Sequence, residues 1–214
     1  MGQARAANLA ELLLLGEPAA VTAVAHAPGL SEELARRLWW IAPTADNARH
    51  MLERGAVVNG ELGKILAAYL ADHLAFETEP RRMIDSVRLV LQPGLIEPAT
   101  RQKIWDKGAM QYAYRVGFLE AVPDDLPNRP AARADSVACE VALAGLLAHN
   151  NPFAQLLVRA LSASGRGFLG VCREVLERPG HQAVVVALLN VIGDYFRDAR
   201  LGAPDARDIH AILE

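Results

Sequence analysis

The sequence predicts an all-α protein made of stacked antiparallel helical hairpins, similar to HEAT-like repeats or another α-solenoid, with about a dozen helices and no sheet. Three observations support this fold class. Apolar residues recur at helical spacing along most of the chain. Capping residues stand at regular intervals between those segments, and one stretch of sequence occurs twice. Ala and Leu dominate the composition, which agrees with the prediction because both are strong helix formers.

Consecutive helices are expected to pair into hairpins of roughly 30 to 35 residues each, close to the length of known helical repeats. Ser31, Thr44 and Asn151 precede apolar-periodic segments and can cap them, and Pro152 stands at a first helical position. The expected pairs are 5–15 with 18–27, 31–42 with 45–54, 60–75 with 79–92, 97–107 with 111–122, 134–148 with 152–163, and 166–178 with 181–199. A short helix near 206–213 is expected to close the chain.

The chain of 214 residues is long enough for one large domain or two small ones. We expect a helical-hairpin repeat region over residues 1–124 and C-terminal helical hairpins, or a bundle, over 133–214. Prolines and charges without periodicity mark the segment Val122–Asp135 as a linker candidate. This segment either separates two domains or is a longer loop inside one continuous domain.

The duplicated stretch reads PGLSEELARRLWW at residues 28–40 and PGLIEPATRQKIW at residues 93–105, an offset of 65 residues. The repeat predicts that Pro28 and Pro93 lie in turns between helices and that Trp40 and Trp105 lie on corresponding helices. The identical pairs at this offset are Pro28 and Pro93, Gly29 and Gly94, Leu30 and Leu95, Glu32 and Glu97, Arg36 and Arg101, Trp40 and Trp105, and Ala48 and Ala113.

In each copy a Glu, an Arg and a Trp stand four residues apart, so the three share one helix face. This stripe has two interpretations. It packs one repeat against the next, with the Trp filling space, or it forms a partner-binding surface, because Trp and Arg are enriched at binding hot spots. The candidate partner-binding residues are Arg36, Trp39, Trp40, Arg101 and Trp105. We expect at least one of the three tryptophans to be exposed beside Arg36 or Arg101.

No catalytic or metal-binding constellation is recognised, and no cofactor is expected. The segment GRGFLG, residues 165–170, has the spacing of a dinucleotide-binding motif but follows a helical segment instead of a strand. We therefore expect Gly165 to end a helix. The six histidines have no metal-ligand spacing, and His73 continues an apolar stripe, which is typical of a core or edge histidine that can also reach Glu77.

Charge and cysteine content limit the kinds of partner and the cellular compartment that we expect. The net charge is −3 and the pI is about 6.1, so nucleic acid is not expected as the main partner. Acidic residues lie before and among Arg81, Arg82 and Arg88, as on a solvated helix face. Cys139 and Cys172 are far apart and each lies among apolar residues, which is typical of buried thiols in a reducing compartment. The longest apolar run is too short to span a bilayer. We expect a cytoplasmic protein without a membrane partner.

Two long stretches resemble DsrS, a family encoded with the Dsr proteins of sulfur-oxidising bacteria, which run dissimilatory sulfite reductase in the oxidative direction. The stretches are MGQARAANLAELLLLGEPAAVTAVAHAPGLSEELARRLWWIAPTADNARHMLER and SVRLVLQPGLIEPATRQKIW followed by GFLEAVPDDLPNRP. The resemblance covers roughly residues 1–130 and implies a cytoplasmic accessory protein of sulfur oxidation, with no catalytic residues carried over. It also implies a further N-terminal segment, so that Leu9–Leu15 abuts a preceding domain.

These observations predict a non-catalytic accessory or scaffold protein that binds a protein partner, such as another Dsr protein, through a helical-repeat surface. Two alternatives stay open. A HEAT-like enzyme acting on DNA, of the glycosylase type, would use Glu32, Arg36 and the tryptophans at 39 and 40 in a groove. A sulfur carrier would use Cys139 or Cys172. The sequence predicts neither the partner's identity nor the oligomeric state.

Overall fold

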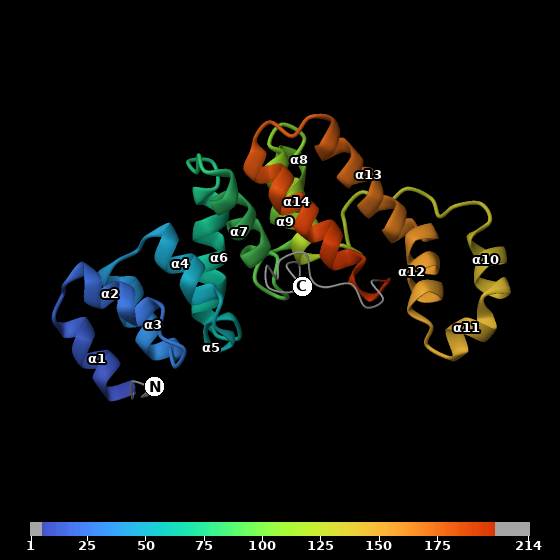
Figure 1. Cartoon of the computed structure of the whole chain (residues 1–214). Helices are drawn as coiled ribbons and strands as arrows, with labels where there is room; N and C mark the ends of the chain where they lie inside the picture. The colour runs from blue at the N-terminus through green and yellow to red at the C-terminus, as the bar shows by residue number, and fades with distance from the viewer. Residues whose placement is uncertain (1–5, 200–214) are drawn as a thin grey trace, which may run out of the picture. The chain divides into compact units, whose positions relative to one another are not determined.

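A computed structural model describes residues 6–199 of the chain, and Figure 1 traces their helices. Within that range the protein has fourteen α-helices and one 3-10 turn, and no strand, which confirms the all-α class. The elements are α1 (Ala6–Leu14), α2 (Pro18–Ala25), α3 (Glu32–Ile41), α4 (Ala45–Leu52), α5 (Gly55–Val58), α6 (Glu61–His73), α7 (Pro80–Val90), α8 (Pro98–Lys107), α9 (Tyr112–Ala121), α10 (Ser136–Ala142), α11 (Ala144–Ala148), α12 (Pro152–Leu161), α13 (Ala163–Glu177), α14 (Gln182–Tyr195) and η1 (Arg197–Ala199). The helix expected near 206–213 lies outside the described residues.

Most expected helices appear within a few residues of their expected ends, and three details differ. The segment 134–148 forms two helices, α10 and α11, instead of one. The four-residue helix α5 was not expected, because so short a segment shows no periodicity. The expectation that Gly165 ends a helix is wrong. Ser162 instead caps α13 by accepting a hydrogen bond from the Gly165 N–H at 3.1 Å, so α12 and α13 are almost continuous.

Gly165 is needed at this tight junction for a steric reason. A Cβ atom at this position would lie 2.0 Å from the Arg159 carbonyl oxygen, a distance that no real contact reaches. The glycine therefore allows the first turn of α13 to pass over the last turn of α12. The GRGFLG segment is part of this helix, which excludes the strand-to-helix turn of a dinucleotide site.

The chain divides into two compact units. The first comprises the residues up to Val122 together with Gly180–Val184, and the second comprises Pro123–Pro179 together with the residues from Val185 onward. The candidate linker packs inside the second unit. Leu126 is buried there, and Arg166 donates a hydrogen bond to the Ala131 carbonyl oxygen at 2.9 Å.

The offset of 65 residues has a structural counterpart in the first unit, because it carries α2, α3 and α4 onto α7, α8 and α9. In each set the first helix contacts the third. Ala48 on α4 and Ala113 on α9 are both fully buried, as equivalent positions should be. The order of the helices is therefore the same in the two segments, while their equivalence in three dimensions and the regular stacking of hairpins along the whole chain stay predictions.

The duplicated PGL segments lie where the repeat predicts. Pro28 lies in the turn before α3 and Pro93 in the turn before α8. The leucines that follow, Leu30 and Leu95, are both buried. The backbone differs in one respect, since Gly94 is left-handed with φ +78° and Gly29 is not among the glycines of positive φ.

Helices α7 and α9 pack closely against each other in the first unit. Five apolar side chains of α7 are buried, as expected for its amphipathic sequence, namely Met83, Ile84, Val87, Leu89 and Val90. A Cβ atom at Gly117 on α9 would lie 2.7 Å from the Val87 Cβ atom and 3.0 Å from the Ile84 carbonyl oxygen. The absence of a side chain at Gly117 thus sets the distance between these two helices.

The second unit is organised around α12 and α13. Phe168 of α13 stacks on Tyr195 of α14 with ring centroids 3.9 Å apart. The guanidinium of Arg159, on α12, lies 3.8 Å from the Tyr195 ring centroid and also forms hydrogen bonds of 2.9 and 2.5 Å with both carboxylate oxygens of Asp124. A buried aromatic pair covered by a paired cation therefore connects three helices and the preceding segment.

The substitution Gly117→Ala should lower the free energy of unfolding of the first unit by about 1–3 kcal/mol, because the added methyl group forces α7 and α9 apart. Urea unfolding followed by tryptophan fluorescence measures this, since all three tryptophans belong to the first unit. Gly55→Ala is the matched control, because a Cβ atom at Gly55 meets nothing within 4 Å. Equal midpoints for the two variants would contradict the close-packing argument.

Candidate functional site

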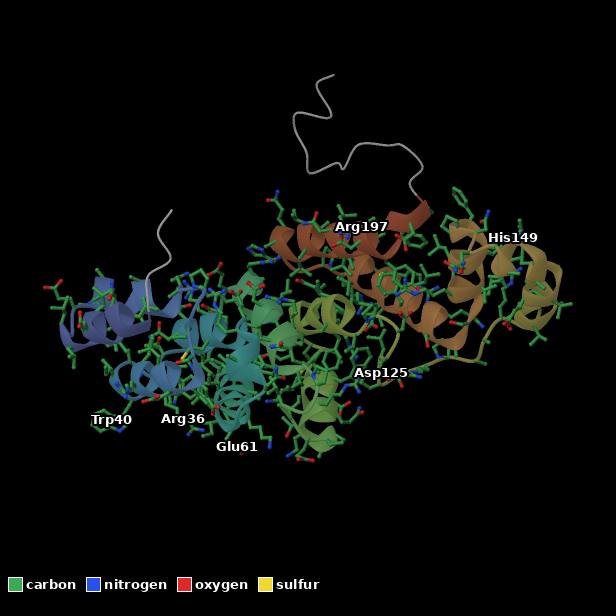
Figure 2. All side chains as sticks on the ribbon, turned by 90° about the horizontal axis from the view of Figure 1, so that it is seen from below. Arg36, Trp40, Glu61, Asp125, His149 and Arg197 are labelled. Atoms are coloured by element: carbon green, nitrogen blue, oxygen red, sulfur yellow. The ribbon has the colours of Figure 1, made fainter. Side chains whose placement is uncertain are left out.

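Helix α3 presents the predicted partner-binding residues of the first copy, and Figure 2 shows Arg36 and Trp40 at the surface. The Ser31 hydroxyl caps this helix by accepting a hydrogen bond from the Leu34 N–H at 3.3 Å. Three apolar side chains, Leu34, Ala35 and Leu38, bury the inner face. That packing orients the opposite face, with Arg36 and Trp40, toward solvent.

Trp40 is 88% exposed, and the neighbouring Ile41 is 45% exposed. Two arginines flank them, and each forms an ion pair one turn back along the helix. Arg36 binds Glu32 at 2.6 Å and Arg37 binds Glu33 at 2.5 Å. The result is a large apolar side chain surrounded by nearly neutralised charges, which is the composition of a small binding hot spot with a polar rim.

Glu32 has a structural role besides its pair with Arg36. Its Oε1 atom accepts a hydrogen bond from the Leu62 N–H at 3.2 Å, so its carboxylate caps the N-terminus of α6 from another helix. The hydrogen bonds from Arg36 and from the Leu62 N–H lower the pKa of Glu32. The acidic end of the predicted stripe therefore holds α3 to α6 instead of facing a partner.

Trp39 points to a different environment from Trp40. It is half-buried and packs edge to face on Tyr69 of α6, with ring centroids 4.9 Å apart. The Tyr69 ring in turn stacks on His73 at 5.7 Å. His73 is thus an edge histidine in an aromatic row, as predicted, while Glu77, its suggested partner, binds Arg49.

The second copy of the stripe does not provide an exposed tryptophan. Trp105 is 3% exposed, packs edge to face on Phe118 at 5.0 Å, and lies under the Arg115 guanidinium at 3.6 Å from the ring centroid. Arg101 is half-buried. Trp105 is therefore a core residue, which corrects its assignment to the partner surface.

The neighbours of Trp105 explain why the two copies differ. Arg115 and Phe118, which cover Trp105, correspond at the offset of 65 residues to His50 and Glu53. A glutamate cannot replace the apolar face that a phenylalanine offers to an indole ring. The same stripe thus packs in the second copy and stays open to solvent at Trp40.

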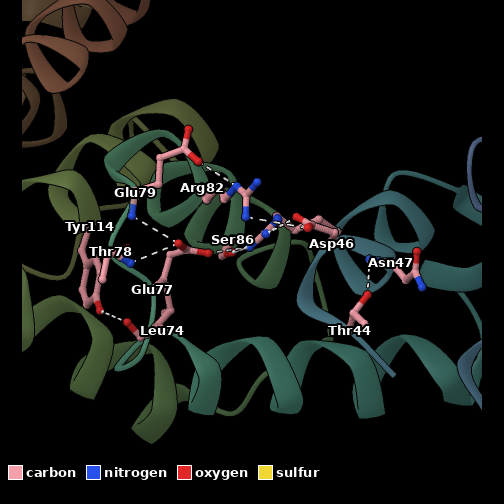
Figure 3. A network of polar contacts seen from close by, with 11 residues as sticks. Thr44, Asp46, Asn47, Leu74, Glu77, Thr78, Glu79, Arg82, Ser86 and Tyr114 are labelled. Atoms are coloured by element: carbon pink, nitrogen blue, oxygen red, sulfur yellow. Dashed lines mark hydrogen bonds and ion pairs between the residues drawn. The ribbon is translucent and has the colours of Figure 1, made fainter. Parts of the chain in front are cut away.

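A network of polar side chains lies inside the first unit (Figure 3). Arg49 on α4 is 7% exposed. It donates hydrogen bonds to Asp46 at 2.5 Å, to Glu77 at 3.3 Å and to Ser86 on α7 at 3.0 Å. Glu77 is also largely buried. Glu77 and Ser86, which follow Arg49 by 28 and 37 positions in sequence, thus provide hydrogen-bond acceptors for one buried cation, as a buried charge requires.

The same carboxylate orders the turn that precedes α7. Glu77 Oε1 accepts hydrogen bonds from the backbone N–H groups of Thr78 at 3.1 Å and Glu79 at 3.2 Å. Arg82 binds Glu79 at 2.7 Å and lies 3.7 Å from Asp46 (Figure 3). Because Asp46 belongs to α4, this contact connects the turn before α7 to α4 a second time. Glu77 therefore fixes both the start of α7 and its position against α4.

Arg49 was not recognised from the sequence, although a signal was present. The buried positions Ala45, Ala48, Arg49 and Leu52 follow the helical spacing of one apolar face, and Arg49 occupies a core position in it. A charged residue at such a position is almost never fully buried without a partner. An arginine at such a position indicates that an acidic side chain is buried beside it, but not which one.

A pair of histidines lies beside this network. The rings of His26 and His50 have centroids 3.8 Å apart. Burial lowers the pKa of His50, and the neighbouring His26 and Arg49 lower it further, against the opposing effect of Glu53 and Asp46. Two imidazoles in contact disfavour the doubly protonated state.

The two cysteines differ in accessibility. Cys172 is buried, and this burial raises the pKa of its thiol to about 12, so almost no thiolate forms at neutral pH. Cys139 is half-buried on α10, with its sulfur 3.9 Å from an Asp135 carboxylate oxygen. That carboxylate is paired with Arg133 through hydrogen bonds of 2.5 and 2.6 Å.

Among residues 6–199, no three or more His, Cys, Asp or Glu side chains gather in a way that could hold a metal ion. In the same part of the chain, no helix is both long and apolar enough to cross a membrane. No family model, curated protein or solved structure matches this chain. The class that the fold defines is an all-helical protein, whose candidate surface is the exposed face of α3.

The substitution Glu77→Ala should lower the free energy of unfolding of the first unit by about 3 kcal/mol, because it removes the buried carboxylate partner of Arg49 and leaves only the more exposed Asp46. The double variant Arg49→Met with Glu77→Gln should regain most of this loss, because it removes both charges. Glu33→Ala is the control, since its ion pair with Arg37 is exposed and worth less than about 1 kcal/mol. Tryptophan-monitored urea unfolding would contradict the prediction if Glu77→Ala and Glu33→Ala gave the same midpoint.

Acid should destabilise the first unit through His50. Because the pKa of His50 is lower in the folded state, the unfolded state binds more protons, and stability falls as the pH drops below the ordinary histidine value of 6.5. His50→Gln should reduce the loss of stability between neutral pH and pH values below 6.5. Urea midpoints measured along a pH series test this. His149→Gln, in the second unit, is the control, and an unchanged pH dependence in His50→Gln would count against the histidine pair.

Proposed function

We propose that this protein is a non-catalytic accessory or scaffold protein that binds a protein partner through the exposed face of α3. The observation that carries the proposal is Trp40, whose side chain is 88% exposed on a helix whose inner face is buried. A monomer gains nothing from a solvated indole, and Trp is among the residues most enriched at binding hot spots. Arg36 and Arg37 beside it supply hydrogen-bond donors for a polar rim.

The setting that we propose is cytoplasmic sulfur oxidation, with another protein of the Dsr system as the partner. The likeness of residues 1–130 to DsrS supports this setting. The arrangement of α3 agrees with a binding role, because the helix is fixed to α6 through Glu32 and so presents Trp40 on a rigid support. A rigid anchor loses little conformational entropy on binding.

The two alternative functions receive less support from the described residues. A DNA-binding groove needs free basic side chains, whereas Arg36, Arg37, Arg81 and Arg82 all form ion pairs with acids. A sulfur carrier needs an accessible thiolate, whereas burial raises the pKa of Cys172 to about 12. The described residues therefore favour the protein-binding function over these two alternatives.

The substitution Trp40→Ser should weaken binding of the partner by about 30-fold, the loss expected for a hot-spot tryptophan. The measurement is quantitative co-purification of Dsr components with the tagged protein from a sulfur-oxidising host, followed by titration of any recovered partner. Stability should change by less than about 0.5 kcal/mol, because an exposed side chain contributes little to folding.

Met110→Ser is the matched control, because Met110 is 90% exposed in the same unit, in the turn between α8 and α9. It should recover the partner as the unmodified protein does. Recovery of no Dsr component while the Dsr proteins are expressed would count against the setting. Equal binding by the Trp40→Ser and Met110→Ser variants would remove Trp40 from the partner surface.

A further inference from the structure

The second unit contains helices with exposed apolar side chains and no core of their own. None of the residues of α10 or α11 is buried. Val137 and Val141 lie one turn apart on α10 and are 70% and 72% exposed. Leu146 on α11 and Phe153 and Leu157 on α12 are each between 45% and 49% exposed. We call residues 136–158, which span these three helices, the apolar arm.

Helices of this length are not stable by themselves. The helix α10 has seven residues and α11 has five, whereas isolated helices shorter than roughly 12 residues are marginal in water. Most helical stability in proteins comes from burying an apolar face. The contacts of α10 and α11 with each other and with α12 bury none of their side chains fully, so another surface is needed to cover them.

The chemistry of the apolar arm indicates what covers it. Glu140 is the only formally charged residue between Ser136 and Val158, although 22% of the whole chain is charged. Surface helices that bind membranes carry Lys and Arg on their polar face, and the arm has none. Surfaces for transient partners are about as polar as ordinary protein surface. Homodimer interfaces are the more apolar class and resemble a core cut in half.

We propose that the apolar arm is a self-association surface, on which a second copy of this chain docks through the same residues. An isologous contact brings a surface against itself, so it brings like charges together unless the surface is almost uncharged. The arm meets that condition, because only the two Glu140 side chains could repel each other. The proposal uses a different unit from Trp40 and does not depend on the function proposed for α3.

Sedimentation velocity on the full chain, from about 1 to 100 µM, tests the proposal over the range in which homodimers of ordinary affinity assemble. The unmodified protein should sediment with twice its mass of 23.1 kDa at the upper concentrations. Val141→Glu should raise the dimer dissociation constant by at least about 100-fold, because it buries an unpaired carboxylate in the contact. Its circular dichroism should stay helical, since Val141 is exposed in the single chain.

Two control variants separate this surface from others. Val186→Glu places the same charge on α14, where Val186 is 52% exposed, and should leave the dimer intact. Trp40→Ser should also leave the dimer intact, although it is expected to lose the partner. If Val141→Glu does not fold, hydrogen exchange of the unmodified protein tests the surface instead. The amides of α10 and α11 should then become more protected from exchange as the protein concentration rises.

Four results would overturn the proposal. The first is a chain that remains monomeric over the whole concentration range. The second is a dimer that Val141→Glu weakens no more than Val186→Glu does. The third is protection of α10 that does not change with concentration, which would mean that the same chain covers the arm. The fourth is co-sedimentation of the monomer with phosphatidylcholine vesicles, which would mean that lipid covers the apolar arm.

Discussion

The buried cation of Arg49 is the constraint on which much of the first unit depends. A guanidinium inside the protein must be matched by acids and acceptors, and these come from the helix of Arg49 itself, from the turn before α7 and from α7. Glu77 is shared between this pair and the backbone of its own turn. The position of α7 against α4 and the start of α7 are therefore set together, and α7 is the helix against which α9 packs.

The duplicated segments show how one local pattern acquires two roles. Helices α3 and α8 begin after similar turns, and both carry Trp at the equivalent position. On α8 the Trp meets Phe118 and Arg115 and becomes part of the core. On α3 the equivalent neighbours are polar, and Trp40 stays solvated. The two copies share the helix and its tryptophan, and the residues of the following helix differ where one tryptophan is buried and the other is exposed.

The two units therefore offer surfaces of different chemistry. The face of α3 combines one large indole with paired charges, which favours a partner of mixed polar and apolar character. The apolar arm is almost uncharged and favours a contact between identical surfaces. If both proposed contacts form, their linkage within one chain would raise the overall affinity beyond that of either contact alone.

The sequence by itself determined most of the helices, the caps at Ser31, Thr44 and Asn151, and the offset of the repeat, because periodicity and capping are local properties. It also indicated the Glu–Arg–Trp stripe as a candidate site. Only the tertiary structure decided that Trp40 is exposed while Trp105 is buried, and that Arg49 pairs with Glu77. Both outcomes depend on side chains from other helices, and neither helical periodicity nor capping specifies which residues those neighbours contribute.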